Sequence, residues 1–96
     1  MTNPLRAIKL SETIGMKPLN ELFPGEKAFI VDMRNSKLCE QLFELGVFPG
    51  DYVEMKENSS GTNSLVVVIN KKKYTIYRNA AETIITNVVS FEVSLN

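Results

Sequence analysis

Apolar and polar residues follow two different periods along this chain of 96 residues. Alternation with a period of two is typical of strands, and it is clearest at 52–57, where Val53 and Met55 alternate with Tyr52, Glu54 and Lys56. Other short segments are rich in β-branched and aromatic residues, which favour strands. The segments predicted as strands are 27–33, 52–57, 65–69, 73–77 and 84–88. In the first of them the apolar run 28–31 is continuous, which indicates a bulge or burial on both faces.

One segment has helical spacing instead. Leu38, Leu42 and Leu45 recur at i, i+4 and i+7, which places them on one face of a helix. Asn35 or Ser36 can cap its first turn, because both side chains accept hydrogen bonds from the free N–H groups there. We expect the leucine face to pack on the core.

The end of this helix is also marked. If Gly46 takes the left-handed conformation after the last turn, Val47 lies over Leu42, which is the apolar pair of a Schellman motif. Pro49 then prevents the helix from resuming.

The phrase Phe-Pro-Gly followed by an acidic residue occurs twice, at 23–26 and at 48–51. Proline sets the first central φ of a type II turn, and glycine accepts the positive φ at the second. Each copy stands just before a predicted strand. We interpret the two copies as independent uses of one turn, because the sequences around them differ.

Together these patterns predict a mainly β fold: a small β-barrel of five to six short strands with one α-helix inserted between the first two strands. Helical turns are expected at 17–23 and 78–83, and polar turns at 58–63 and 70–73. The barrel domain is expected over 18–88, with an N-terminal extension at 1–17. Residues 89–96 form a C-terminal extension with alternating apolar residues, which can add a strand to its own barrel or to a neighbouring copy.

Charge and composition narrow the class of protein. Eleven basic residues balance eleven acidic ones, so the chain has no field for long-range capture of nucleic acid or anionic membrane, and nucleic acid is an unlikely partner. No segment approaches the ~20 apolar residues of a membrane span, so direct membrane insertion is not expected. Cys39 alone cannot form an intrachain disulfide, and the first residues lack the apolar core of a secretory signal. A reducing, cytoplasmic location is expected.

Side chains for catalysis or metal binding are scarce. The chain has no histidine and one cysteine, so neither a Ser-His nor a Cys-His nucleophile pair, nor a histidine-rich metal site, can form. Glu40 and Glu44 form an i, i+4 pair that is typical of a solvated helix edge, and Cys39 is expected to pack as a small hydrophobe. We therefore predict no catalytic residues, no cofactor and no metal ligands.

A run of three lysines, 71–73, is the one charge cluster. The simplest interpretation is a solvated hairpin tip. The alternative is a contact for acidic protein or nucleic acid, in which Tyr74 and Tyr77 stack on bases.

The remaining functional candidate is a protein-binding surface. Small barrels bind partners through loops and exposed strand edges, and the helix with its exit carries more aromatic surface than a small core needs. The residues predicted to bind a partner are Glu40, Phe43, Glu44, Leu45, Gly46 and Phe48.

The order of these motifs resembles the FeoA family of bacterial ferrous-iron uptake. The shared motifs are Pro-Leu-x-x-Leu at 18–22, Pro-Gly at 24–25 and Leu-x-x-x-Gly-x-x-x-Gly at 42–50, within a resemblance that covers 18–88. The resemblance implies an SH3-like β-barrel and a non-enzymatic accessory role on the cytoplasmic GTP-binding region of the membrane transporter FeoB. Alternatives are an SH3-like regulatory or nucleic-acid-binding module, and a metal-sensing domain related to the C-terminal domain of iron-dependent repressors.

Overall fold

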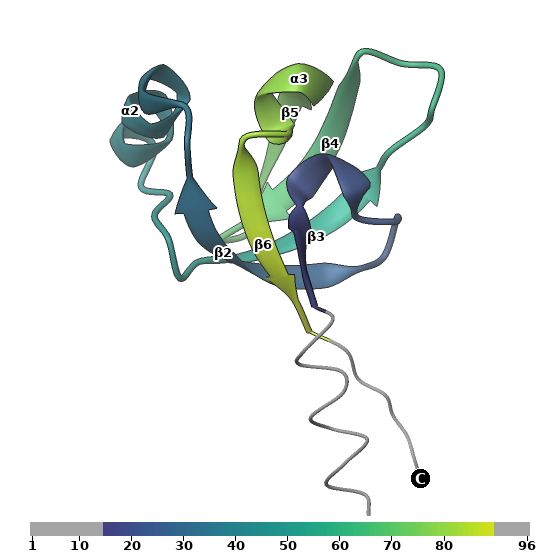
Figure 1. The fold of residues 1–96 in the computed structure, drawn as a ribbon, viewed down its shortest axis with the longest axis horizontal. Helices are drawn as coiled ribbons and strands as arrows, with labels where there is room; N and C mark the ends of the chain where they lie inside the picture. The colour runs from purple at the N-terminus through teal and green to yellow at the C-terminus, as the bar shows by residue number, and fades with distance from the viewer. Residues whose placement is uncertain (1–14, 90–96) are drawn as a thin grey trace, which may run out of the picture.

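A computed structural model describes residues 15–89, which form one curved antiparallel sheet with short helical segments around it (Figure 1). The elements in chain order are β1 (Met16–Pro18), η1 (Leu19–Glu21), β2 (Lys27–Met33), α2 (Ser36–Glu44), β3 (Tyr52–Glu57), β4 (Ser64–Ile69), β5 (Lys72–Tyr77), α3 (Arg78–Ala81) and β6 (Ile84–Val88). The predicted strands, the helix and both helical turns are confirmed, whereas the sequence pattern did not indicate β1.

The strands lie in the order β1-β6-β2-β3-β4-β5, and every neighbouring pair is antiparallel. The mainly β, SH3-like fold is confirmed, but the sheet is not closed into the barrel that we expected. Strands β1 and β5 remain edges, and the segments that follow them, η1 and α3, contact each other.

The continuous apolar run in β2 is explained by a bulge. The pairing of β2 with β6 shifts its register between Ile30 and Asp32. The extra residue, Val31, is 44% exposed, while Ile30 and Met33 on either side are buried. One of the two predicted explanations, the bulge, is therefore correct.

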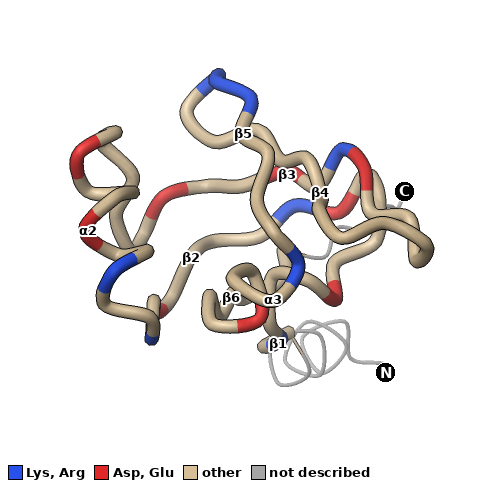
Figure 2. The backbone as a smooth tube through the Cα atoms, turned by 90° about the horizontal axis from the view of Figure 1, so that it is seen from above, with Lys and Arg blue, Asp and Glu red and all other residues tan. Residues whose placement is uncertain are grey.

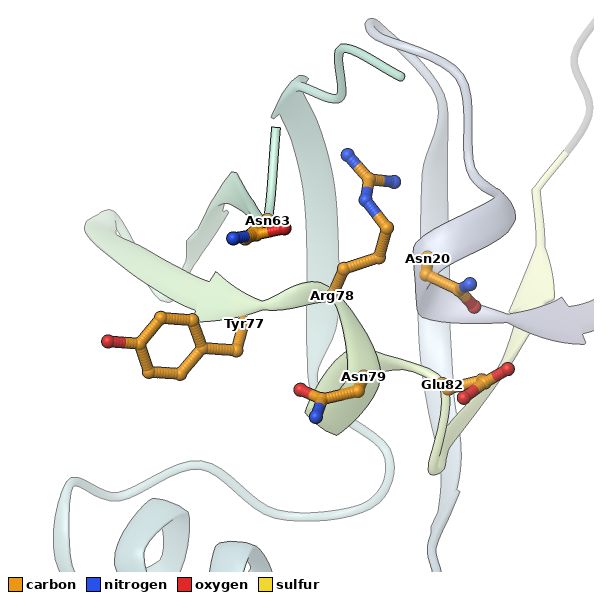
Figure 3. Close-up of a pocket in the computed structure, with 6 residues that line it drawn as sticks. All are labelled: Asn20, Asn63, Tyr77, Arg78, Asn79 and Glu82. Atoms are coloured by element: carbon orange, nitrogen blue, oxygen red, sulfur yellow. The ribbon is translucent and has the colours of Figure 1, made fainter. Parts of the chain in front are cut away.

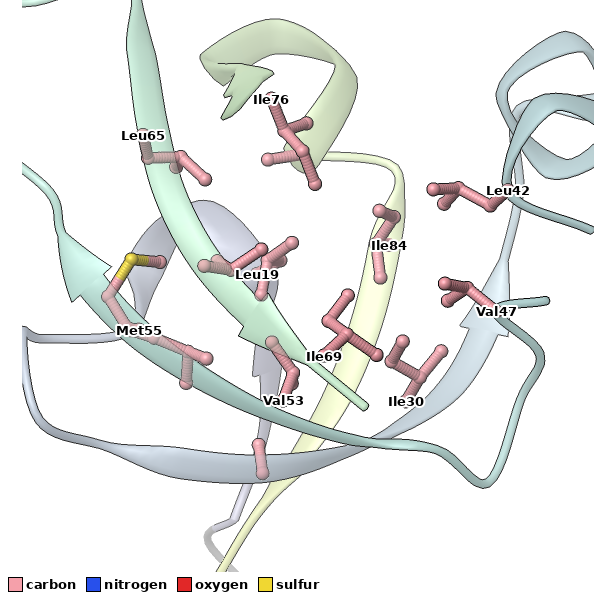
Figure 4. Packing of buried hydrophobic residues seen from close by; sticks show 14 of the residues in the cluster. Leu19, Ile30, Leu42, Val47, Val53, Met55, Leu65, Ile69, Ile76 and Ile84 are labelled. Atoms are coloured by element: carbon pink, nitrogen blue, oxygen red, sulfur yellow. The ribbon is translucent and has the colours of Figure 1, made fainter. Parts of the chain in front are cut away.

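The core lies between the concave face of the sheet and the helical segments (Figure 4). Each long strand supplies buried side chains at alternate positions, and Leu42 and Val47 cover one end. The expectation that Leu45 packs on the core is wrong, because this side chain is 56% exposed. Leu45 is the C-cap of α2, and the turn that follows directs Val47, not Leu45, into the core.

The two copies of Phe-Pro-Gly-acid form the same turn. Gly25 and Gly50 have φ of 93° and 99°, as a type II turn requires. In each copy the acidic side chain accepts a hydrogen bond from the phenylalanine N–H: Glu26 Oε1 from Phe23 at 2.7 Å, and Asp51 Oδ2 from Phe48 at 2.9 Å. The acidic residue therefore belongs to the motif, because it closes the corner from which β2 or β3 begins.

The hairpin between β4 and β5 ends in a tight turn. Asn70 and Lys71 both have positive φ, 54° and 70°, as in a type I′ turn. The three lysines 71–73 are exposed at this tip, and Figure 2 shows them as a blue cluster at the end of β5.

Two expectations about the ends of the chain concern residues outside 15–89. Residues 1–14 of the predicted N-terminal extension and residues 90–96 of the predicted added strand lie outside the described residues. The N–H of Val89 donates to the carbonyl of Lys27 at 2.8 Å, so backbone pairing beside β2 continues to the last described residue. In the stretch from 15 to 89, no helix is long and apolar enough to cross a bilayer.

Candidate docking surface at the exit of α2

The six residues predicted to bind a partner lie on α2 and on the turn that follows it. All six are exposed, which is consistent with a contact surface but does not test binding. Among them Phe43, Leu45 and Phe48 expose 41%, 56% and 47% of their surface. We call these three residues the helix-exit patch.

The helix begins and ends at the predicted signals. Asn35 caps α2, because its Oδ1 accepts a hydrogen bond from the N–H of Leu38 at 3.0 Å. At the other end the N–H of Val47 donates to Leu42 at 2.8 Å, and that of Gly46 donates to Phe43 at 3.0 Å. With Gly46 at φ 85°, this is the predicted Schellman motif.

The Schellman motif decides which side chains remain outside. It reverses the chain so that Val47 is fully buried while Phe43 and Phe48 meet on the surface. Their ring centroids are 4.9 Å apart with an interplanar angle of 31°. Aromatic pairs at this separation attract each other, so the two rings support one another without being buried.

The β4–β5 hairpin fixes the position of the turn below the patch. The side-chain amide of Asn70 donates to Asp51 Oδ2 at 3.2 Å and lies 3.5 Å from the carbonyl of Gly46. Asp51 Oδ2 also accepts the N–H of Phe48. The patch is therefore held by contacts on both sides of the chain reversal, which reduces the entropy that a partner must remove on binding.

Charged residues border the patch. Glu40 and Glu44 are exposed on α2, and Lys71 lies beside Asn70 on the neighbouring hairpin tip. Cys39 is half-buried and packs against the core, as a small hydrophobe does. An apolar centre with a polar rim is the usual anatomy of a protein-binding surface.

A pocket lies around Arg78, on the side of η1 and α3 (Figure 3). Its volume is about 560 Å³, and it is lined by Asn20, Asn63, Tyr77, Arg78, Asn79 and Glu82. Sequence reasoning missed this pocket, because its lining comes from three segments that are far apart in the sequence.

Arg78 organises the loop between β3 and β4. Its guanidinium donates to Asn58 Oδ1 at 2.6 Å, to the carbonyl of Ser59 at 2.7 Å and to that of Thr62 at 3.0 Å. Asn58 in turn donates to the carbonyls of Asn20 and Leu22 at 2.9 and 2.7 Å. Arg78 therefore acts structurally, since its donors are used within the chain.

The side chains described between 15 and 89 offer surfaces for binding rather than a cluster of reactive or metal-binding groups. Among residues 15–89, no group of three or more Cys, Asp or Glu side chains is placed to hold a metal ion. The two features that stand out are the apolar helix-exit patch and the polar pocket beside Arg78.

Comparison with known families gives one match. The family model described as "FeoA domain" matches residues 17–87. A search of curated protein sequences finds no significant match.

Solved structures with the same fold include a FeoA protein and an iron(II) transport protein. The chain has a TM-score of 0.71 and 22% identity with the FeoA protein from Chlorobium tepidum, over 79% of this chain and 73% of that one. It has a TM-score of 0.68 and 29% identity with iron(II) transport protein A from Clostridium thermocellum, over 75% of this chain and 45% of that one.

A third similar structure is a manganese-dependent transcriptional repressor. The TM-score is 0.70 at 10% identity, over 77% of this chain and 42% of the repressor. At this identity the likeness shows the fold alone, and the chain spans less than half of the repressor.

Proposed function

Because this chain belongs to the FeoA domain family, we propose that it is a non-enzymatic, cytoplasmic accessory protein of ferrous-iron uptake that docks on a FeoB-like membrane transporter. The observation that carries the proposal is the helix-exit patch. An exposed, pre-positioned aromatic pair, on a helix exit that also exposes Leu45, supports binding to another protein, because burying such side chains supplies most of the free energy of an interface.

The partner surface should complement the patch. It needs an apolar groove wide enough for two rings in tilted contact, with polar or charged groups opposite the exposed Glu40 and Glu44 of α2. We place this groove on the transporter's cytoplasmic GTP-binding region, which is the partner that the FeoA resemblance implies.

The test is a pull-down of the transporter's cytoplasmic region by the full chain under reducing conditions. Leu45→Glu is the variant of choice, because Leu45 is exposed and a carboxylate there reaches water. Met16→Glu is the matched control: Met16 is 52% exposed and lies on β1, which pairs with β6.

We expect Leu45→Glu to weaken binding at least tenfold and Met16→Glu to leave it within twofold. Circular dichroism must show that both variants are folded. No capture by the unmodified chain, or equal capture by both variants, contradicts the proposal.

The metal-sensing alternative lacks a specific observation in its favour. The repressor likeness shows the fold alone, and the donors described between 15 and 89 do not gather around a common point. Anaerobic calorimetry with Fe(II) tests it, and tight stoichiometric binding would support it over the docking role.

A further inference from the structure

The two edges of the sheet are not equivalent. Strand β1 has three residues and ends in Pro18, which has no N–H to offer. Strand β5 has six residues, Lys72–Tyr77, and contains neither proline nor a bulge in its pairing with β4. Only β5 therefore presents an edge long enough to pair with another strand.

The backbone groups available at this edge follow from the register. Arg78 donates its N–H to the carbonyl of Asn63 at 2.7 Å, so this pair is hydrogen-bonded across the β4–β5 ladder. Hydrogen-bonded pairs alternate along an antiparallel ladder. The N–H and C=O groups of Lys73 and Thr75, which pair at Val68 and Val66, therefore point away from β4, as does the N–H of Tyr77, which pairs at Ser64. The C=O of Tyr77 serves α3, because Tyr77 is the N-cap of that helix.

These edge groups are open within the described chain. The loop and terminal backbone hydrogen bonds formed by residues 15–89 include none to Lys73, Thr75 or Tyr77. Their side chains are also exposed, and Tyr77 exposes 71% of its surface. A strand laid along β5 would thus find both backbone groups of Lys73 and Thr75, the N–H of Tyr77, and the Tyr77 ring beside them.

The two ends of the edge differ in charge and shape. At one end are the lysines 71–73 of the hairpin tip (Figure 2). At the other end Tyr77 forms part of the wall of the 560 Å³ pocket, so the edge continues into that hollow (Figure 3). A bound segment can therefore extend past the end of β5 into this pocket.

We propose that the edge of β5 binds an extended, acidic peptide segment of another protein by strand addition. Backbone hydrogen bonds to Lys73, Thr75 and Tyr77 supply affinity, and the lysines select carboxylates. The bound peptide continues past Tyr77 into the pocket beside Asn79. This surface is distinct from the helix-exit patch, so the inference goes beyond the docking function proposed above.

Two other occupants fit the edge less well. Nucleic acid can pair with lysines but has no peptide groups to match those of β5. A second copy of β5 would bring three more lysines and no carboxylate to the same edge, because the segment 71–77 contains no acidic residue. Charge complementarity therefore favours an acidic peptide.

The test uses the full chain and a fluorescein-labelled ten-residue peptide that alternates glutamate with valine or threonine. Its counterpart has lysine in place of each glutamate. Fluorescence anisotropy at low salt should show the acidic peptide binding at least tenfold more tightly than the basic one, with the difference decreasing as salt rises.

Thr75→Pro separates strand addition from charge attraction. Proline removes the edge-facing N–H without removing a hydrogen bond to β4, and Thr75→Ala is the control that keeps the N–H. We expect Thr75→Pro to weaken binding of the acidic peptide at least fivefold and Thr75→Ala to change it less than twofold. Leu45→Glu should leave peptide binding unchanged, which distinguishes this surface from the helix exit.

Amide chemical shifts of the unmodified chain provide a measurement that does not depend on a variant. Titration with the acidic peptide should move the Lys73, Thr75 and Tyr77 amides more than those of β1. Equal binding of both peptides, an unaffected Thr75→Pro variant, or shifts confined to the lysine side chains would overturn the proposal. So would tighter binding of a single-stranded oligonucleotide at the same site, or dimerisation of the chain through β5.

Discussion

The side-chain amide of Asn70 donates to the carboxylate of Asp51 across 3.2 Å and so joins the β4–β5 hairpin tip to the corner that begins β3. Asn70 has two roles at this position. Its backbone adopts the positive φ that the turn needs, and its side chain fixes the loop beneath Phe48. The hairpin tip thereby positions the helix-exit patch, although the two are far apart in sequence.

Replacing Asn70 should separate these two roles. Asn70→Gly keeps the positive φ but removes the amide, and it should lower the free energy of unfolding by about 0.5–1.5 kcal/mol, as for one hydrogen bond. Asn70→Ala removes the amide and also strains the backbone, so its loss should be larger. Urea denaturation measures both, and a glycine variant less stable than the alanine variant would contradict the double role.

Leu42 and Leu45 form a matched pair on the same helix. Leu42 is 4% exposed and Leu45 is 56% exposed. Leu42→Ala should therefore lower the free energy of unfolding by about 2–5 kcal/mol, because it leaves a cavity in the core. Leu45→Ala should change it by less than about 0.5 kcal/mol. Thermal unfolding of the two variants checks this, and similar midpoints would show that Leu45 is also part of the core.

Gly46 should resist substitution for a reason of backbone conformation alone. A Cβ added there would meet no atom within 4 Å, but φ is 85°. Gly46→Ala should lower the free energy of unfolding by about 1–2 kcal/mol, which is the cost of a left-handed residue with a side chain. Chemical denaturation measures the change. Gly61→Ala is the control, because its surroundings are equally open and no positive φ is involved.

Arg78 should not be replaceable by lysine. Its guanidinium contacts Asn58, Ser59 and Thr62 at once, whereas an ammonium group cannot reproduce this fork. Arg78→Lys should lower the free energy of unfolding by about 1–3 kcal/mol, as expected for hydrogen bonds to a charged group. Hydrogen exchange should show faster opening of the 58–63 loop in this variant. Unchanged exchange there would mean that the loop holds its shape without Arg78.

Local signals predicted most of the secondary structure. The N-cap at Asn35, the Schellman motif at Gly46 and the two Pro-Gly turns depend on residues within a few positions of one another. The family was also indicated, because its motifs are short and ordered. The strand β1 was missed, since three residues carry too little pattern to show alternation.

The candidate sites were predicted less completely. Phe43, Leu45 and Phe48 were named from sequence, but that Leu45 faces water, and that Asn70 supports the turn, depend on contacts with distant segments. The pocket beside Arg78 and the unpaired edge of β5 were not predicted. Both depend on which strands become neighbours and on where η1 and α3 pack.

The sequence by itself determined the local elements: where strands alternate, where the helix begins and ends, and where glycine must turn the chain. Backbone sterics and short-range hydrogen bonds act over a few residues, so their signals can be recognised in the sequence. The tertiary structure alone decided that the sheet stays open and that β5 is its longer edge. It also decided that Leu45, which was expected in the core, stays exposed. These outcomes depend on packing between segments that are distant in sequence, and no local pattern specifies which surfaces remain uncovered.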